Sequence, residues 1–173
     1  MPRMLKLIGA VLGALVLAFT ALGLVLPRVL RIERSVELPA PLSVVAAEVE
    51  DLSRWQGWAF GPEAKGCTFL GSSATELRWT CGDVEGALLR TDRSPGTVWI
   101  DARVGGTVER VRMKLSLTEL PSGTLLAWQE QATAPRVMGA WLRPWLERAR
   151  GDEIDRSLAR LRARLVPATP QGS

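Results

Sequence analysis

Carboxylates are the side chains of this chain best suited to acid–base chemistry, because its 173 residues include no histidine and no tyrosine. The lack of histidine excludes histidine-based triads, histidine metal sites and histidine general bases. Glu109 and Glu130 share the inward parity of their predicted strands, and an inward carboxylate can act as a general acid or base. Each could instead lie near a sheet end, solvated or paired with an arginine. These two residues are the catalytic candidates, and we find no metal-ligand set or cofactor-binding motif beside them.

Seven tryptophans form a second group of candidate residues. Aromatic side chains at strand and helix positions fill the core by default. Strand alternation nevertheless turns several large apolar side chains toward the concave face of the predicted sheet, and a concave, mostly apolar surface is typical of a small-molecule site. Trp99 has the opposite parity and could form an exposed contact, for example at a membrane interface. The predicted ligand-binding residues are Phe69, Trp79, Met113, Leu115 and Trp128 on strands, with Trp141 and Trp145 on the helix that covers them.

The two cysteines, Cys67 and Cys81, lie symmetrically about a turn centred near Ala74. This register sets Cys67 opposite Cys81 and Phe69 opposite Trp79. Directly opposed residues have Cβ atoms about 4.5–5.5 Å apart, which permits a disulfide after modest adjustment. A disulfide would indicate an oxidising compartment. The alternative is a pair of buried free thiols.

The segment that would position the domain at a membrane is Leu7–Leu26, twenty consecutive residues without charge or proline. About 20 apolar helical residues span a bilayer core of about 30 Å, so residues 1–27 are predicted to form a single-pass transmembrane anchor. A cleaved signal peptide is the alternative, and Arg3 and Lys6 would suit one, but the apolar run exceeds the usual h-region. Flanking charges are nearly balanced, and the short N-terminal tail favours a periplasmic or otherwise extracytoplasmic domain.

Residues 28–166 are predicted to form one α+β domain, and residues 167–173 a flexible tail. A strand over Leu30–Leu38 leads into a helix over 42–51 and a shorter helical piece that includes Trp55. Six strands separated by turn residues then predict an antiparallel meander, which gives a curved sheet of about seven strands. These strands cover 67–70, 76–81, 84–92, 97–104, 108–119 and 125–133. A helix from Pro135 to Leu165 lies across the sheet, with a kink or restart expected at Pro144.

The charge distribution bears on possible partners. The formal net charge is +4, and two of the positive charges precede the anchor, so the balance does not indicate nucleic-acid binding. Residues 136–165 hold eight arginines against four carboxylates. A solvated helix face explains this excess, and contact with anionic lipid headgroups beside the anchor is the alternative.

Several short motifs occur in an order that resembles the SRPBCC superfamily, the START and birch-pollen-allergen-like helix-grip group. Its bacterial members include polyketide cyclase/dehydrase and lipid transport proteins, some with a similar N-terminal hydrophobic helix. The resemblance covers roughly residues 32–165. One departure is Ala59-Phe60-Gly61-Pro62, where the family often has a Trp-Ser-Pro-Trp-like loop. The matching motifs are Arg34–Pro41, Asp51–Trp55 with Trp58, Leu77–Trp79 with Gly82 and Gly86, Gly123-Thr124 with Trp128, and Gly151–Ile154 with Leu158 and Leu161.

The resemblance implies a cavity between the sheet and the long helix that holds an apolar small molecule, and it implies no single reaction. The sequence therefore predicts a membrane-tethered binding domain for a hydrophobic or lipid-like ligand, without a cofactor. The expected partners are the lipid bilayer and the ligand, and no protein partner can be named. One alternative is a cyclase/dehydrase-type enzyme that uses an inward carboxylate. The other is a module with a vestigial cavity that docks a partner or headgroups through Arg156, Arg160 and Arg164.

Overall fold

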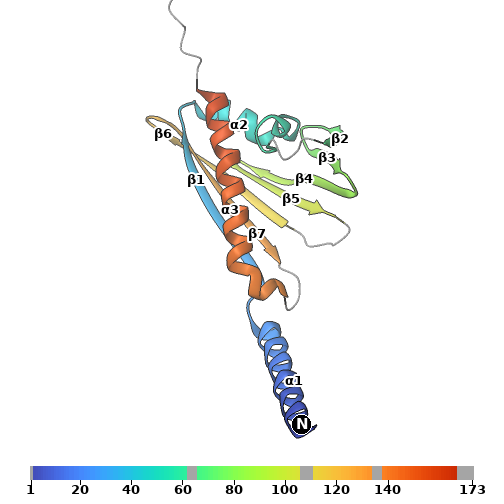
Figure 1. Cartoon of the computed structure of the whole chain (residues 1–173). Helices are drawn as coiled ribbons and strands as arrows, with labels where there is room; N and C mark the ends of the chain where they lie inside the picture. Colours follow the sequence, from blue (N-terminus) through green and yellow to red (C-terminus); the bar gives the residue numbers. More distant parts are fainter. Residues whose placement is uncertain (1, 62–65, 106–110, 134–137, 167–173) are drawn as a thin grey trace, which may run out of the picture.

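The computed structural model describes residues 2–61, 66–105, 111–133 and 138–166 (Figure 1). An N-terminal helix precedes a domain of one sheet and several helices, in the predicted order. In chain order the elements are α1 (Pro2–Val25), β1 (Val29–Leu38), α2 (Leu42–Glu50), the 3₁₀ helix η1 (Leu52–Gly57), β2 (Cys67–Ser72), β3 (Glu76–Cys81), β4 (Val84–Ser94), β5 (Thr97–Val104), β6 (Val111–Leu120), β7 (Gly123–Thr133) and α3 (Met138–Leu165).

The seven strands form one antiparallel sheet in the order β1-β7-β6-β5-β4-β3-β2, and α3 crosses it (Figure 1). The predicted α+β helix-grip architecture is therefore confirmed. The predicted hairpin register is also confirmed, because Cys67 pairs with Cys81 and Phe69 with Trp79. Gly123 begins β7 with φ at 144°, and a Cβ there would lie 2.1 Å from the carbonyl oxygen of Leu38. Glycine thus lets β7 start directly beside the end of β1.

Alternation along the strands builds the core on the concave face. On β6, Met113, Leu115 and Leu117 are buried while Arg112 is exposed. Ile154, Leu158 and Leu161 of α3 are buried as well, which matches the stripe that their spacing predicts. Full burial of each such side chain contributes about 1.5–3 kcal/mol relative to exposure. Sheet and helix are therefore held together mainly by apolar contact.

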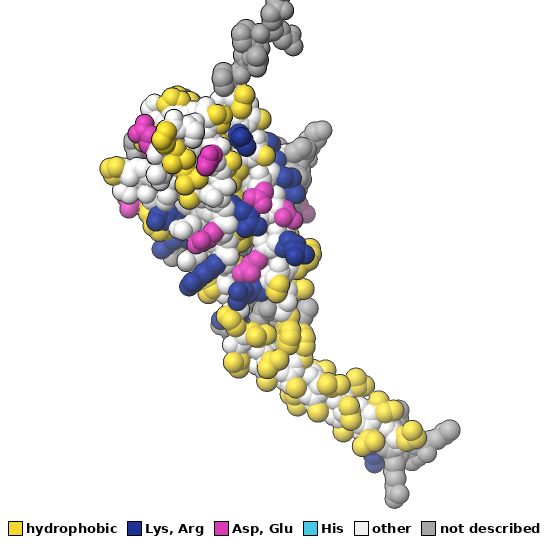
Figure 2. Space-filling view, turned by 90° about the vertical axis from the view of Figure 1, so that its left-hand side faces the viewer, with side chains coloured by type: hydrophobic (Ala, Val, Ile, Leu, Met, Phe, Trp, Pro, Cys, Tyr) yellow, Lys and Arg dark blue, Asp and Glu magenta, His cyan; other side chains and the backbone are white. Residues whose placement is uncertain are grey.

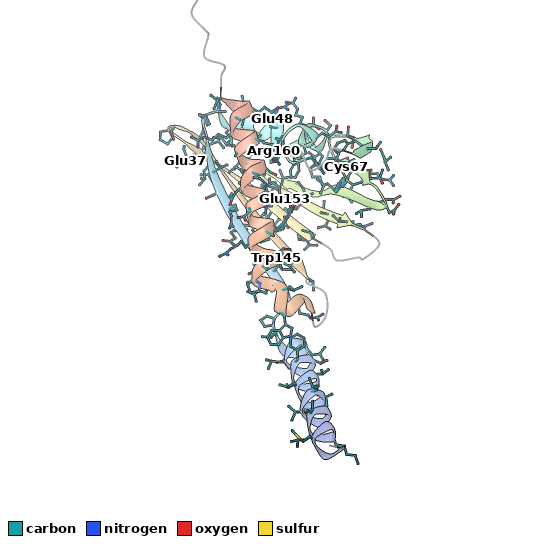
Figure 3. All side chains as sticks on the ribbon, viewed as in Figure 1. Glu37, Glu48, Cys67, Trp145, Glu153 and Arg160 are labelled. Atoms are coloured by element: carbon teal, nitrogen blue, oxygen red, sulfur yellow. A yellow bond between two sulfur atoms is a disulfide. The ribbon has the colours of Figure 1, made fainter. Side chains whose placement is uncertain are left out.

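Helices α2 and η1 close the end of the domain that lies away from α1. Trp55 and Trp58 are fully buried there. Glu48 of α2 accepts a hydrogen bond from Arg54 at 2.9 Å and forms an ion pair with Arg164 of α3 at 3.3 Å. Figure 3 places Glu48 and Arg160 at this end and Trp145 at the end nearest α1. The two ends of α3 thus lie in different surroundings.

Helix α3 runs without a break through Pro144, so of the expected kink or restart, the restart does not occur. Proline at this position removes one intrahelical hydrogen bond, the one its N–H would donate to the carbonyl of Ala140. Pro144 lies in the second turn of a 28-residue helix, and the remaining turns keep their hydrogen bonds. The helix boundary expected at Pro135 lies outside the described residues.

Helix α1 carries the apolar segment. Its span Lys6–Val25 has a mean hydropathy of 2.5 and is long enough to cross a membrane, a property that signal sequences share. Figure 2 shows hydrophobic side chains along α1, with few charged side chains until the domain begins. The part of the chain that the structure describes therefore contains one candidate membrane anchor.

Candidate functional site

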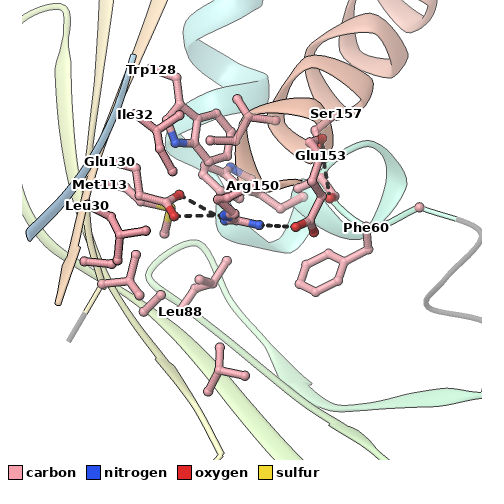
Figure 4. Close-up of a pocket in the computed structure, with 18 of the residues that line it drawn as sticks. Leu30, Ile32, Phe60, Leu88, Met113, Trp128, Glu130, Arg150, Glu153 and Ser157 are labelled. Carbon is pink, nitrogen blue, oxygen red and sulfur yellow. Dashed lines mark hydrogen bonds and ion pairs between the residues drawn. The ribbon is translucent and has the colours of Figure 1, made fainter. Parts of the chain in front are cut away.

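The described residues surround a cavity of about 590 Å³ between the sheet and α3. Its volume falls within the range of small-molecule sites. Most of the wall is apolar, and the remainder is a small cluster of polar side chains (Figure 4). The apolar wall includes Leu30, Ile32, Leu88, Met113, Leu146 and Ile154.

Three of the seven residues predicted to bind a ligand lie on the cavity wall: Trp79, Met113 and Trp128. Local sequence explains the position of Trp79. Its strand partner is Gly86, and a Cβ at Gly86 would lie 2.2 Å from the indole ring. The missing side chain on β4 therefore makes room for the tryptophan on β3.

Phe69 and Leu115 lie close to the cavity without lining it. Phe69 is half-buried and packs edge-on against Phe60, which does line the cavity, with ring centroids 5.2 Å apart. Leu115 is fully buried in the core. It lies two residues beyond Met113 on β6, toward the end that the aromatic side chains of η1 fill. Phe69 therefore packs beside the wall residue Phe60, and Leu115 lies opposite the wall residue Trp128 in the sheet.

The expectation that Trp141 and Trp145 line the cavity is wrong. Trp145 is 66% exposed, and Trp141 stacks on Phe19 of α1 with ring centroids 4.7 Å apart and an interplanar angle of 7°. Leu146, not Trp145, is on the wall, because successive helical residues are rotated by about 100° around the axis. The apolar spacing of these tryptophans reflects contact with α1 and an outer surface of the molecule.

Glu130 forms the centre of the polar cluster and is only 3% exposed. Arg150 donates from Nε and Nη2 to its two carboxylate oxygens at 2.8 and 3.0 Å, and from Nη1 to Glu153 at 2.7 Å. Burial opposes the charge of the guanidinium, but the hydrogen bonds and charges of Glu130 and Glu153 outweigh it and raise the pKa of Arg150. The cluster is thus one cation held between two carboxylates, with a net formal charge of −1.

Strand alternation predicts Glu130 as an inward carboxylate, whereas none of the predicted site residues is Arg150. A signal was present, because stepping back four residues at a time from Leu158 reaches Ile154, Arg150 and Leu146 on one helix face. Glu109, the second predicted carboxylate, lies outside the described residues. For Glu130 the structure thus shows the alternative to a catalytic role, a carboxylate paired with an arginine.

Polar contacts from α3 also hold the segment after η1 against the cavity. Ser157 donates to the carbonyl of Ala59 at 3.0 Å, and Arg160 donates to the carbonyl of Trp58 at 2.8 Å. Ala59 and Ser157 both line the cavity. Arg160 is therefore engaged within the domain, whereas Arg164 pairs with Glu48 while its side chain stays 47% exposed.

The disulfide and Trp99 lie on different parts of the sheet. The sulfurs of Cys67 and Cys81 are bonded at 1.97 Å, which joins the start of the edge strand β2 to the end of β3 on the cavity wall. Trp99 lies half-exposed with the Nζ of Lys114 5.5 Å from its ring centroid. The disulfide therefore belongs to the site, whereas Trp99 does not line it.

Solved structures with the same fold share little sequence with this chain. A START superfamily protein from Mycobacterium smegmatis superposes with a TM-score of 0.61 at 18% identity, over 81% of this chain and 99% of that one. A conserved protein from Geobacillus kaustophilus gives 0.61 at 14% identity, over 79% and 95%. A protein from Chromobacterium violaceum gives 0.56 at 16% identity, over 82% and 99%. These likenesses establish the fold.

No curated protein matches the chain. The family described as "Polyketide cyclase / dehydrase and lipid transport" matches residues 29–166, which include every element from β1 to α3. This match covers most of the chain and all of the cavity wall, and the chain therefore belongs to the polyketide cyclase/dehydrase and lipid transport family.

Proposed function

We propose that this protein is a membrane-tethered binding domain that holds a hydrophobic or lipid-like small molecule between its sheet and α3. The observation that carries the proposal is the cavity of about 590 Å³ with a mostly apolar wall. Transfer of apolar ligand surface from water into such a wall is favourable by about 25 cal/mol per Å². A vestigial cavity would instead be filled by its own side chains.

The polar cluster limits the chemistry of the ligand's polar end. Arg150 already donates three hydrogen bonds to Glu130 and Glu153, whereas ionised carboxylates can accept further ones. A free carboxylate or phosphate would meet the net formal charge of −1 in a low-dielectric cavity. The favoured ligand has an apolar body and an end that donates hydrogen bonds, such as a hydroxyl, an amide or an amine.

Two observations support a retained anchor and an extracytoplasmic domain. Phe19 of α1 stacks on Trp141 of α3, a contact that would be lost if α1 were cleaved as a signal peptide. The disulfide between Cys67 and Cys81 favours an oxidising compartment. We infer a single-pass protein whose domain lies on the periplasmic or equivalent side.

Binding accounts for the cavity better than catalysis by Glu130 does. A general acid or base must reach its substrate with a carboxylate oxygen. Both oxygens of Glu130 accept hydrogen bonds from Arg150, and neither histidine nor tyrosine is present to assist. Each carboxylate oxygen of Glu130 therefore already has one hydrogen-bond partner before a substrate enters the cavity.

The test is ligand extraction and dye displacement with the full-length chain purified in mild detergent. We expect an apolar molecule in mass spectra of the extract, and displacement of a hydrophobic dye by neutral lipids more readily than by free fatty acids. Ala132→Phe, on the cavity wall, should reduce dye binding severalfold. Ala163→Phe, on the exposed face of α3, is the matched control. An empty extract together with no displacement by any lipid would refute the proposal.

A further inference from the structure

Large apolar side chains are exposed at the end of α3 that lies nearest α1 (Figure 3). Trp141, Leu142 and Trp145 are 37%, 45% and 66% exposed. Figure 2 shows the hydrophobic surface of α1 continuing onto this end of the domain, with Lys, Arg, Asp and Glu side chains gathered beyond it. Tryptophan is enriched where a protein surface meets the headgroup region of a membrane. These three residues form the tryptophan face of α3.

The contact between α1 and α3 sets the depth of this face. Phe19 lies six residues before Val25, the last residue of α1, which corresponds to about 9 Å along the helix axis. In a spanning α1, Phe19 therefore lies below the membrane surface. Because Trp141 stacks on Phe19, the first turns of α3 must reach a similar depth. Interfacial helices bury their apolar face about 5–10 Å into the headgroup and acyl boundary.

Positive charges lie close to the tryptophan face in the sequence and along α3. Arg28 and Arg31 follow α1 directly, and Arg148 is one turn beyond Trp145. Among the described residues, none of these three side chains has a carboxylate partner. Arginines at this level suit the phosphate groups of lipids. The apolar tryptophan face thus lies where the acyl boundary would be, and the arginines lie next to it, where the headgroups would be.

The rim of the cavity begins at the same end. Leu30 is five residues beyond α1 and pairs with Ala132 near the end of β7, and both residues line the cavity. Leu146 lines the cavity from α3 immediately after Trp145, which points outward. The same turn of α3 therefore places Leu146 on the cavity wall and Trp145 on the outer surface near α1.

We propose that the tryptophan face is inserted into the headgroup–acyl boundary of the bilayer that α1 spans, and that the cavity exchanges its ligand with this bilayer at the adjacent rim. The occupant of the face is the lipid surface itself. An apolar molecule then passes from acyl chains to the cavity wall between Leu30, Ala132 and Leu146 with little exposure to water. Insertion depends on a spanning α1, whereas ligand exchange also depends on the proposed binding function.

Depth-dependent quenching tests insertion. The full chain is reconstituted in nanodiscs of phosphatidylcholine with phosphatidylglycerol, with an environment-sensitive dye on Leu142→Cys, which keeps both tryptophans. Ala163→Cys, exposed near the other end of the same helix, is the matched control, and the native cysteines are bonded to each other. Lipids with a nitroxide near the headgroup should quench the dye at position 142 severalfold more than the dye at position 163. Equal quenching at the two positions, or none at 142, would overturn the proposal.

A second measurement separates insertion from ligand exchange. In the variant Leu142→Asp/Trp145→Asp we expect uptake of a fluorescent neutral lipid from the nanodisc to slow severalfold, while uptake from detergent micelles stays as in the unchanged chain. Equal uptake from nanodiscs by both chains would refute exchange at the rim. If neither chain takes up lipid from either source, the proposed binding function fails, and the quenching result still decides insertion.

Discussion

The two ends of α3 have similar apolar spacing and opposite surroundings. At the end away from α1, Leu158 and Leu161 are buried against the sheet and η1, and Arg160 is hydrogen-bonded to Trp58. At the end near α1, Trp145 and Leu142 are largely exposed. Periodicity shows that a helix face contacts something apolar, but the element opposite decides whether that partner is protein or lipid.

The same truncation should therefore have very different effects at the two ends, and this is the largest effect we expect. Leu158→Ala removes a side chain that is 1% exposed and should lower the free energy of unfolding of the domain by about 2–5 kcal/mol. Leu142→Ala, the matched change at the other end, should change it by less than about 0.5 kcal/mol. Denaturant titration of the full chain in detergent measures both. Equal losses would show that Leu142 is also part of the core.

The disulfide should stabilise the edge of the sheet formed by β2 and β3. It closes a loop between Cys67 and Cys81, 14 positions apart, and a loop of that size corresponds to about 3 kcal/mol in the chain-entropy account. The variant Cys67→Ala/Cys81→Ala and the reduced unchanged chain should both lose stability by about this amount, with β2 as the first strand to exchange its amide hydrogens. Identical unfolding curves for oxidised and reduced protein would contradict the prediction.

The polar cluster lies between the two ends and should have an intermediate effect. Glu130→Gln leaves Glu153 as the only carboxylate partner of Arg150 and should lower the free energy of unfolding by about 1–3 kcal/mol. The loss is smaller than the loss from breaking a fully buried ion pair, because Arg150 is partly exposed. The substitution also removes a negative charge from the cavity, so displacement of the dye by fatty acids should improve relative to neutral lipids. Asp155→Asn breaks an ion pair with Arg34 at the surface. It should lower the free energy of unfolding by less than about 1 kcal/mol and leave the ligand preference unchanged.

The smallest effect is expected at the closed end, where Asp51 caps η1. Its carboxylate accepts hydrogen bonds from the hydroxyl and backbone N–H of Ser53 at 2.6 and 3.0 Å. The Ser53 hydroxyl chiefly lowers the pKa of Asp51 below its ordinary 3.8; burial opposes this shift, and the Ser53 N–H and Arg54 add to it. Asp51→Ala should lower the free energy of unfolding by about 1 kcal/mol near neutral pH.

The sign of the pH dependence follows from that lowered pKa. An acid with a depressed pKa in the folded state contributes its stability above the unfolded value of 3.8, and loses it as the pH falls through the folded value. The unfolding free energies of the unchanged chain and of Asp51→Ala should therefore converge at the lowest pH. A constant difference from neutral pH to below 3.8 would assign the effect to something other than the charge of Asp51.

Local patterns in the sequence determined the class and connectivity of this fold. The alternation of β6, the stripe from Ile154 to Leu161 and the apolar run of α1 each depend on neighbours within one element, so they can be read directly from the chain. The pairing of Cys67 with Cys81 could be predicted as well, because one short turn sets the register of that hairpin.

Only the tertiary structure decided which side chains form the site. The pairing of Arg150 with Glu130 joins α3 to β7 across the cavity, and its geometry depends on how the whole sheet curves around the helix. The sequence predicts cavity positions for Trp141 and Trp145, yet Trp141 lies against Phe19, more than a hundred residues earlier in the chain. Spacing within a helix fixes which residues share a face, whereas the partner of that face depends on packing between elements distant in sequence.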